Sequence, residues 1–179
     1  MSPPASSREV ILDAAEAVVL ESGASHMTLD AVAAKADVSK GGLLYHFPTK
    51  EALLRAMLER FSKQIDETQK KKAQGLKKGP RREIQAFILS ITERDRKKDQ
   101  IGAALLAAVA HDPKLLQLAR DDFRRRLAEF MEPGLNFQRA SVIHFALIGL
   151  VFSELLSLSP LSNKERNELV EELLRLVDK

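Results

Sequence analysis

The 179-residue chain contains no cysteine and no long apolar run. Without cysteine, disulfides and thiolate metal sites are excluded, which agrees with a reducing compartment. The longest strongly apolar stretch, Phe145–Phe152, is far shorter than the roughly 20 residues of a membrane-spanning helix. The first ten residues, MSPPASSREV, lack the basic and apolar regions of a secretion signal. We therefore expect a cytoplasmic protein without a membrane span.

Motifs of catalysis are also missing. The chain has no HExxH pattern, no glycine-rich phosphate loop and no compelling pairing of a nucleophile with a base. We therefore expect that the protein is not an enzyme, has no catalytic residue and binds no metal or cofactor. A hydrophobic content of 45% is enough to build the core of one or two compact units.

The positive charge of the chain is concentrated in one segment. Residues 1–62 carry a net charge of −2 and residues 83–179 a net charge of −1, whereas residues 63–82 carry +6. The pI near 9.2 thus reflects one short run, which is typical of a solvated surface. Local pattern, and not the pI, must decide whether the chain binds nucleic acid.

Apolar residues recur at spacings of three and four along most of the chain, and no window alternates as a β-strand does. We predict an all-α fold of about nine helices, with an N-terminal three-helix helix-turn-helix domain over residues 1–50 and a C-terminal helical bundle over residues 51–179. The last four helices are expected at residues 100–111, 113–131, 137–158 and 162–178.

A helix-turn-helix consists of two short helices joined by a three-residue turn, and its second helix enters the DNA major groove. Here the segments are TLDAVAAKA, a turn at Asp37-Val38, and SKGGLLYHF. In the second helix Leu43 and Phe47 lie four residues apart and should face inward. The outward positions are then Lys40, Gly41, Leu44 and Tyr45.

The chemistry around this second helix favours DNA. Within a helix, Gly41 and Gly42 each cost about 1 kcal/mol relative to alanine, and close approach to DNA would compensate. The alternative is that they mark a loosely formed turn. The segment Ser39–Lys50 contains no acidic residue but two lysines, a histidine, a tyrosine and hydroxyls. Thr28, Ser39 and Thr49 each mark a helix start, whose amide groups can bind phosphate.

With SKGGLLYHFPTKEALL downstream of TLDAVAAKADV, residues 8 to about 60 resemble the DNA-binding domain of the TetR family of bacterial regulators. The resemblance implies that Lys40, Gly41 and Gly42 lie at base edges. It also places Leu43, Phe47 and Leu53 in the core. The residues that it places on phosphates are Thr28, Ser39, Tyr45, His46 and Lys50.

Three positions depart from the family pattern. Asp37 stands in the turn where the family commonly has glycine, although aspartate tolerates the left-handed conformation better than most residues. Gly42 and Leu44 stand where the family often has threonine and tyrosine. Their contacts are either missing or replaced by an apolar contact with a thymine methyl group.

The resemblance implies that residues 51–179 form a ligand-sensing and dimerising bundle. The segment VIHFALIGLVFSELL is apolar on nearly all faces, as expected where a core meets a subunit interface. We therefore expect a homodimer through residues 137–158 and 162–178, in which Gly149 permits close helix approach. The alternative is a monomer that buries this helix at its centre.

The sequence gives little information about the ligand site. The candidates to line an apolar pocket are Phe87, Leu106, Phe123, Leu127, His144, Phe145 and Ile148. The alternative for each of them, and the more common case for such residues, is plain core, and for His144 a core histidine whose hydrogen bonds are satisfied.

The resemblance thus implies a sequence-specific, DNA-binding transcriptional repressor that binds double-stranded DNA at an inverted-repeat operator and is released by a small-molecule effector. The alternative is a helical ligand-binding or interaction protein whose DNA-binding unit is vestigial. Leu44, Gly42 and the acidic surroundings of the helix-turn-helix support that alternative.

Overall fold

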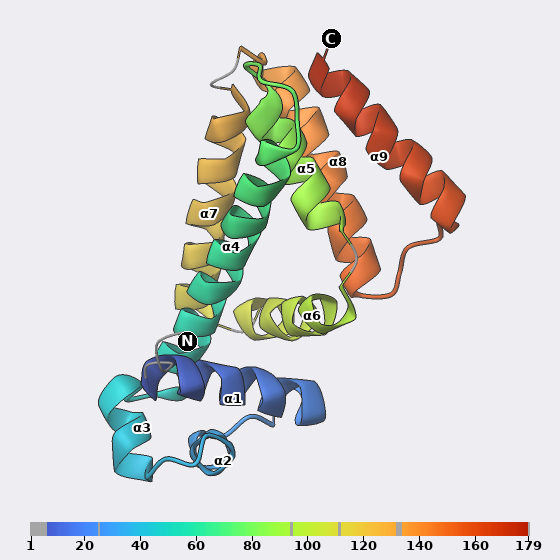
Figure 1. Ribbon diagram of the computed structural model, residues 1–179. Helices are drawn as coiled ribbons and strands as arrows, with labels where there is room; N and C mark the ends of the chain where they lie inside the picture. Colours follow the sequence, from blue (N-terminus) through green and yellow to red (C-terminus); the bar gives the residue numbers. More distant parts are fainter. Residues whose placement is uncertain (1–6, 25, 94, 111, 132–133, 179) are drawn as a thin grey trace. The chain divides into compact units, whose positions relative to one another are not determined.

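The computed structural model describes residues 7–24, 26–93, 95–110, 112–131 and 134–178. Over these residues the chain forms nine α-helices and no strand, so the all-α prediction is confirmed (Figure 1). The helices are α1 (Ser7–Ser22), α2 (Leu29–Lys35), α3 (Lys40–His46), α4 (Lys50–Gln74), α5 (Arg82–Thr92), α6 (Arg96–Ala110), α7 (Pro113–Met131), α8 (Phe137–Leu155) and α9 (Asn163–Asp178).

The chain divides into two compact units. Unit 1 comprises residues 1–61 and 96–117, and unit 2 comprises residues 62–95 and 118–179. Helices α4 and α7 therefore contribute residues to both units. None of the described helices is long and apolar enough to cross a membrane.

Unit 1 is built around α1, which packs against α2 and α6. One face of α1 is buried, with Ile11, Leu12 and Ala15 fully inaccessible. Helix α1 ends before Gly23, which adopts the left-handed conformation with φ of +82°. Met27 completes the core beneath the helix-turn-helix.

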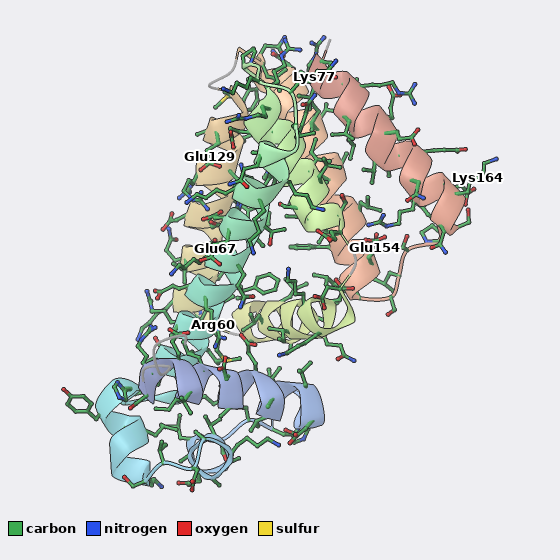
Figure 2. The ribbon with its side chains drawn as sticks, viewed as in Figure 1. Arg60, Glu67, Lys77, Glu129, Glu154 and Lys164 are labelled. Atoms are coloured by element: carbon green, nitrogen blue, oxygen red, sulfur yellow. The ribbon has the colours of Figure 1, made fainter. Side chains whose placement is uncertain are left out.

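Unit 2 has a separate apolar core. Helix α5 packs against α8 and α9, and α8 packs against α9. The core residues that these three helices and α7 contribute include Phe87, Ile88, Phe130, Ile143, Leu147 and Leu173. Arg166 of α9 locks this packing, because its Nε lies 2.6 Å from Oε1 of Glu154 on α8 and its guanidinium also donates to the carbonyl of Thr92 (Figure 2 labels Glu154).

Two helix boundaries differ from those predicted. Helix α8 ends at Leu155 because Ser157 adopts φ of +56° and the N–H of Leu158 turns back to the carbonyl of Ser153, at 2.7 Å. Helix α6 begins at Arg96 and not at Gln100, since its first turn is charged and carries no apolar periodicity.

Candidate nucleic-acid interface and effector pocket

Helix α3 has a buried and an exposed face. Leu43 is fully buried and Phe47 is 2% exposed, as their spacing predicted, and Leu53 of α4 is fully buried with them. The exposed face carries the five predicted base-contacting and neighbouring positions, Lys40, Gly41, Gly42, Leu44 and Tyr45.

The turn between α2 and α3 is closed by Asp37. This residue adopts φ of +52°, its N–H donates to the carbonyl of Ala34 at 3.3 Å, and the N–H of Val38 donates to the carbonyl of Ala33 at 3.1 Å. These two bonds form a Schellman motif, which satisfies the last carbonyls of α2. Aspartate therefore performs the role that glycine has in the family pattern.

Hydroxyl side chains cap three successive helices of unit 1. The capping bonds run to Thr28 Oγ1 from the N–H of Ala31 (3.1 Å), to Ser39 Oγ from the N–H of Gly42 (3.1 Å) and to Thr49 Oγ1 from the N–H of Ala52 (3.0 Å). All three caps are exposed. A hydroxyl that accepts a bond still has its own proton to donate, so each cap can add a hydrogen bond to a phosphate oxygen.

The two glycines of α3 have different surroundings. A Cβ atom at Gly41 would meet nothing within 4 Å, whereas one at Gly42 would lie 3.3 Å from Ser39 Oγ, the cap of the same helix. Packing within the chain therefore gives no reason for glycine at position 41. This supports close approach of a partner at that point.

The remaining predicted DNA contacts lie on or beside this surface. Tyr45 is 86% exposed and Leu44 36%. The His46 ring meets Tyr45 edge-on, with ring centroids 5.2 Å apart. Lys50 is half-buried in the first turn of α4. An aromatic hydroxyl that projects so far from the fold is well placed to reach a phosphate.

Ion pairs of Arg60 hold α4 against α1 within unit 1. Arg60, labelled in Figure 2, donates to Asp13, and its Nε lies 3.5 Å from Oε1 of Glu16 and 3.9 Å from Oε2 of Glu9. Burial alone would lower the pKa of Arg60, but the three carboxylates outweigh it and the pKa is raised. The guanidinium thus stays charged and joins α4 to α1.

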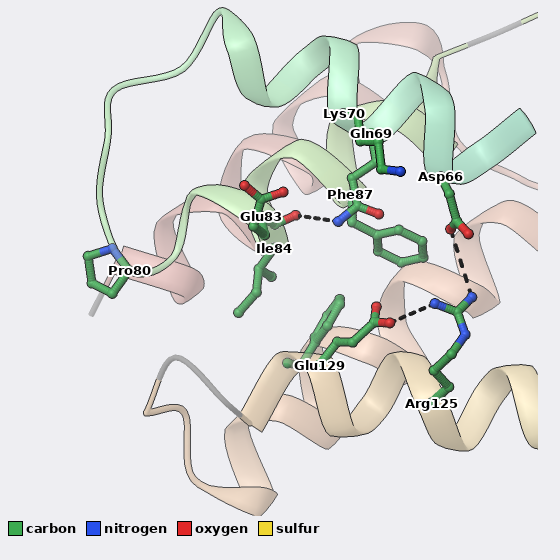
Figure 3. Close-up of a pocket in the computed structure, with 10 residues that line it drawn as sticks. Asp66, Gln69, Lys70, Pro80, Glu83, Ile84, Phe87, Arg125 and Glu129 are labelled. Atoms are coloured by element: carbon green, nitrogen blue, oxygen red, sulfur yellow. Dashed lines mark hydrogen bonds and ion pairs between the residues drawn. The ribbon is translucent and has the colours of Figure 1, made fainter. Parts of the chain in front are cut away.

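Unit 2 contains a pocket of about 540 Å³ between α4, α5 and α7 (Figure 3). Its lining combines apolar and charged side chains: Asp66, Gln69, Lys70, Pro80, Glu83, Ile84, Phe87, Arg125, Glu129 and Phe130. The buried rings of Phe87 and Phe130 pack edge to face, with centroids 5.7 Å apart. Arg125 bridges the pocket from α7, because its guanidinium contacts Glu129 at 2.6 Å and Asp66 at 3.8 Å.

Beside this pocket a buried arginine joins α7 to α4. The side chain of Arg126 is 5% exposed, and its guanidinium binds Asp66 (3.1 Å), Asp122 (2.9 Å) and Ser62 (3.2 Å). Burial would raise the pKa of Asp122, but Arg126 and Arg125 lower it below its usual value. The sequence alone does not distinguish Arg126 from a surface residue, because it is the last of three consecutive arginines. Its only signal is its position, three residues after Phe123 and four before Phe130.

Of the seven predicted ligand residues, only Phe87 lines the pocket. Phe123, Leu127 and Ile148 are half-buried elsewhere in unit 2, His144 is 1% exposed, and Leu106 belongs to unit 1. Phe145 is 63% exposed. Their role in ligand binding stays a prediction. No group of three or more His, Asp or Glu residues within the described ranges is arranged to hold a metal ion.

Helix α8 buries one face in unit 2 and exposes apolar side chains on the other. Ala140, Ile143 and Leu147 are inaccessible, whereas Val142 and Phe145 are 61% and 63% exposed. Gly149 lies on the exposed face, and a Cβ there would meet nothing within 4 Å. A single chain therefore does not bury the second apolar face of this helix.

A capped helix-turn-helix, a hydroxyl-rich exposed surface and a separate helical core define a DNA-binding regulator. Residues 11–57 match the family model described as bacterial regulatory proteins, tetR family. Residues 81–178, more than half of the chain, match the model of the tetracyclin repressor-like C-terminal domain. The protein belongs to the TetR family of DNA-binding transcription regulators. No curated protein matches the sequence.

Solved structures share the fold over nearly the whole chain. A TetR-family member from Streptomyces coelicolor A3 is 23% identical, covers 96% of this chain and 98% of its own, and has a TM-score of 0.75. A transcriptional regulator from Rhodococcus sp. Rha1 is 19% identical, covers 96% of both chains and has a TM-score of 0.78. The multidrug binding protein EbrR, crystallised with imidazole, is 24% identical over 94% of this chain and 88% of its own, with a TM-score of 0.73.

Proposed function

We propose that this regulator is a cytoplasmic repressor, and not an enzyme, that binds an inverted-repeat operator as a homodimer and leaves it when a small molecule binds. Residues 1–50 hold the DNA, and residues 51–179 sense the ligand and dimerise. This functional division differs from the two compact units because α6 packs against α1. The observation that supports the proposal best is the exposed surface of α3. Packing within the chain does not explain why residue 41 on this surface is glycine.

The DNA contacts follow from this surface. Lys40, Gly41 and Gly42 meet base edges, and Leu44 meets a thymine methyl group. The caps Thr28 and Ser39, together with Tyr45, His46 and Lys50, bind phosphates. These contacts position the protein, whereas the base contacts select the sequence.

The exposed face of α8 supports the homodimer. Two copies that bury Val142, Phe145 and Gly149 against each other would cover apolar surface that a single chain leaves in water. The dimer would present two recognition helices about 34–36 Å apart, one DNA turn, and therefore read an inverted repeat. Helix α4 has residues in both compact units, so it is the element that can carry a signal from ligand to DNA.

A relative supports a small-molecule effector. EbrR is described as a multidrug binding protein and was crystallised with imidazole. By analogy, the pocket of about 540 Å³ in unit 2 is where a ligand would bind to this chain.

A competitive titration tests the proposed function. The purified protein is titrated onto the DNA surrounding its own gene, with random duplex as competitor and at two salt concentrations. We expect a complex of one dimer per inverted repeat that resists the competitor. Binding that is weak and lost with salt for this fragment and for a library of genomic fragments would contradict the proposal and favour a vestigial helix-turn-helix.

A further inference from the structure

Three side chains of unit 2 keep a buried polar atom without a hydrogen-bond partner among the described residues, namely Ser141, which is half-buried, and two that are almost fully buried. The atoms of these last two are Nη1 of Arg126 and Nδ1 of His144. The Arg126 side chain is 5% exposed and His144 is 1% exposed. Leaving such groups unpaired is costly, and more so for a charged group. His144 is therefore not the satisfied core histidine that the sequence leaves open.

One aromatic enclosure surrounds both residues. The Phe87 ring lies against the Arg126 guanidinium, 4.7 Å from the ring centroid. The rings of Phe123 and Phe130 meet His144 edge-on, at 5.8 and 5.7 Å. Because Phe123 and Phe130 flank Arg126 at helical spacing on α7, and Phe87 contacts Phe130, the arginine and the histidine lie against the same cluster of aromatic rings.

This enclosure adjoins the pocket of unit 2. Phe87 and Phe130 line the pocket and also contact Arg126 or His144. Asp66, which lines it from α4, binds Arg126 directly. The pocket volume of about 540 Å³ lies within the roughly 300–1,000 Å³ of small-molecule sites. Arg126, His144 and Phe123 do not line the pocket themselves, so a ligand reaches the two unpaired atoms by extending from the pocket past Phe87 and Phe130.

The carboxylates of this region are already paired with arginines, and Lys70 at the pocket is exposed. Asp66 is paired with Arg126, Glu129 with Arg125, and Glu83 with Arg82. A cationic ligand would have to displace an arginine from its carboxylate. An anionic ligand at Arg126 would lie beside Asp66 and Asp122, whose negative charges would repel it. An uncharged oxygen acceptor could bind Arg126 Nη1 without either cost.

His144 fits the same ligand chemistry. Burial lowers the pKa of His144, and the nearby Arg126 lowers it further, so the ring is neutral at pH 7. A neutral imidazole donates one hydrogen bond, and with the proton on Nδ1 this atom donates to an oxygen.

We propose that the effector is an uncharged, ring-containing molecule that extends from the pocket into the aromatic enclosure. There its oxygen accepts hydrogen bonds from Arg126 Nη1 and His144 Nδ1, and its rings pack against Phe87, Phe123 and Phe130. This inference rests on the proposed function, because it names the ligand class of the sensing domain.

Four naphthalene probes of similar shape test the ligand class by calorimetric titration of the full chain at pH 7.5. They are 2-acetylnaphthalene, which is neutral with a carbonyl; 2-ethylnaphthalene, which is neutral without an acceptor; 2-naphthoate, an anion; and 2-naphthylmethylammonium, a cation. We expect 2-acetylnaphthalene to bind about tenfold more tightly than each of the others. Tighter binding of either charged probe, equal binding of the two neutral probes, or no binding of 2-acetylnaphthalene would overturn the proposal.

Two variants test the residues. His144→Phe keeps a buried ring and removes Nδ1, so the affinity for 2-acetylnaphthalene should fall about fivefold or more while that for 2-ethylnaphthalene stays the same. Glu168→Gln is the control, because it removes an exposed carboxylate of α9 that does not line the pocket and changes neither donor; it should leave both affinities unchanged. An unchanged affinity in His144→Phe would remove His144 from the site. The DNA titration of the same preparations tests the proposed function separately. A protein that binds its operator but does not bind 2-acetylnaphthalene would contradict only the inference about the ligand class.

Discussion

Nζ of Lys40, the first residue of the recognition helix α3, lies 2.8 Å from Oδ1 of Asp30 on α2. Both side chains are well exposed, 61% and 68%. An ion pair of this kind is weak in water, so Lys40 can leave Asp30 at little cost. The carboxylate of Asp30 nevertheless competes with DNA phosphates for Lys40, the first residue of the recognition helix.

Replacing Asp30 should therefore strengthen DNA binding. Asp30→Asn removes the competing charge and keeps the shape of the side chain, and we expect about two- to fivefold tighter binding to operator and random duplex alike. Fluorescence anisotropy on labelled duplexes measures this. The matched control is Glu21→Gln, which removes a carboxylate from another exposed ion pair of unit 1, with Lys35. An equal gain in DNA affinity in both variants would mean that the net charge of unit 1, and not the pair of Asp30 with Lys40, determines the effect.

Gly41→Ala should separate stability from DNA binding. A Cβ at position 41 meets nothing within 4 Å, so the folded chain should gain up to about 1 kcal/mol of stability from the better helix former. The same methyl group would stand between α3 and the base edges, so operator affinity should fall about tenfold. Urea denaturation and operator titration measure the two effects. A variant that is more stable and binds equally well would show that DNA does not approach this glycine.

The sequence predicts the DNA-binding half well because its rules are local. Leu43 and Phe47 face inward because they lie four residues apart on a helix, and the hydroxyl of Ser39 caps that helix because of its place before it. Asp37 is harder to predict because the turn requires a left-handed backbone, which favours glycine. Aspartate tolerates this conformation, and the turn forms with it. Such features depend on neighbours within a few residues.

The sensing half is harder to predict because its properties depend on contacts between distant residues. Arg126 lies within three consecutive arginines, and only the approach of Asp66, sixty positions earlier, shows that it is buried and paired. The ion pair of Lys40 with Asp30 is likewise invisible in the spacing. Periodicity identified α8 as apolar all round but could not tell which side a single chain leaves exposed.

Phe145→Glu should break the proposed homodimer without unfolding the chain. Phe145 is 63% exposed, so a charge there costs the single chain little, whereas two buried carboxylates at a two-fold interface would repel each other. We expect the dimer dissociation constant to rise at least about tenfold, and operator affinity to fall with it. Sedimentation at several concentrations measures the assembly.

Tyr45→Glu is the control for this experiment, because it places the same charge at an exposed aromatic residue, 86% exposed, on the DNA-binding surface. It should leave the dimer intact and abolish tight DNA binding. If Phe145→Glu sediments as the unaltered protein does, the α8 face is not the interface.

Arg126→Ala should be strongly destabilising. The substitution leaves Asp66 and Asp122 without their buried partner, which costs about 3 kcal/mol, the lower end for buried pairs because both carboxylates are partly exposed. Arg124→Ala is the control, since that side chain is 74% exposed and its ion pair with Asp121 lies at the surface; the expected change is below about 1 kcal/mol. Urea denaturation compares the two. Equal losses would mean that the buried network contributes nothing beyond helix propensity.

The buried imidazole of His144 should make stability depend on pH. Burial, with Arg126 close by, lowers the pKa of His144 in the folded chain below its ordinary value of 6.5. As the pH falls through 6.5, the unfolded chain takes up a proton that the folded chain refuses, so the free energy of unfolding decreases until the pH reaches the folded pKa. The loss proceeds at up to about 1.4 kcal/mol per pH unit. Asp122, whose pKa is also lowered, loses its contribution only near and below pH 4 and does not overlap this window.

Urea denaturation at pH 7.5, 6.5 and 5.5 measures this effect, with His144→Phe as the reference that keeps a ring at the site and cannot titrate. The stability of the natural chain relative to the variant should decrease from pH 7.5 to pH 5.5. A difference that stays constant over this range would show that His144 accepts a proton as readily inside the fold as outside it, and the enclosure of Phe87, Phe123 and Phe130 would then be more open to water than its packing indicates.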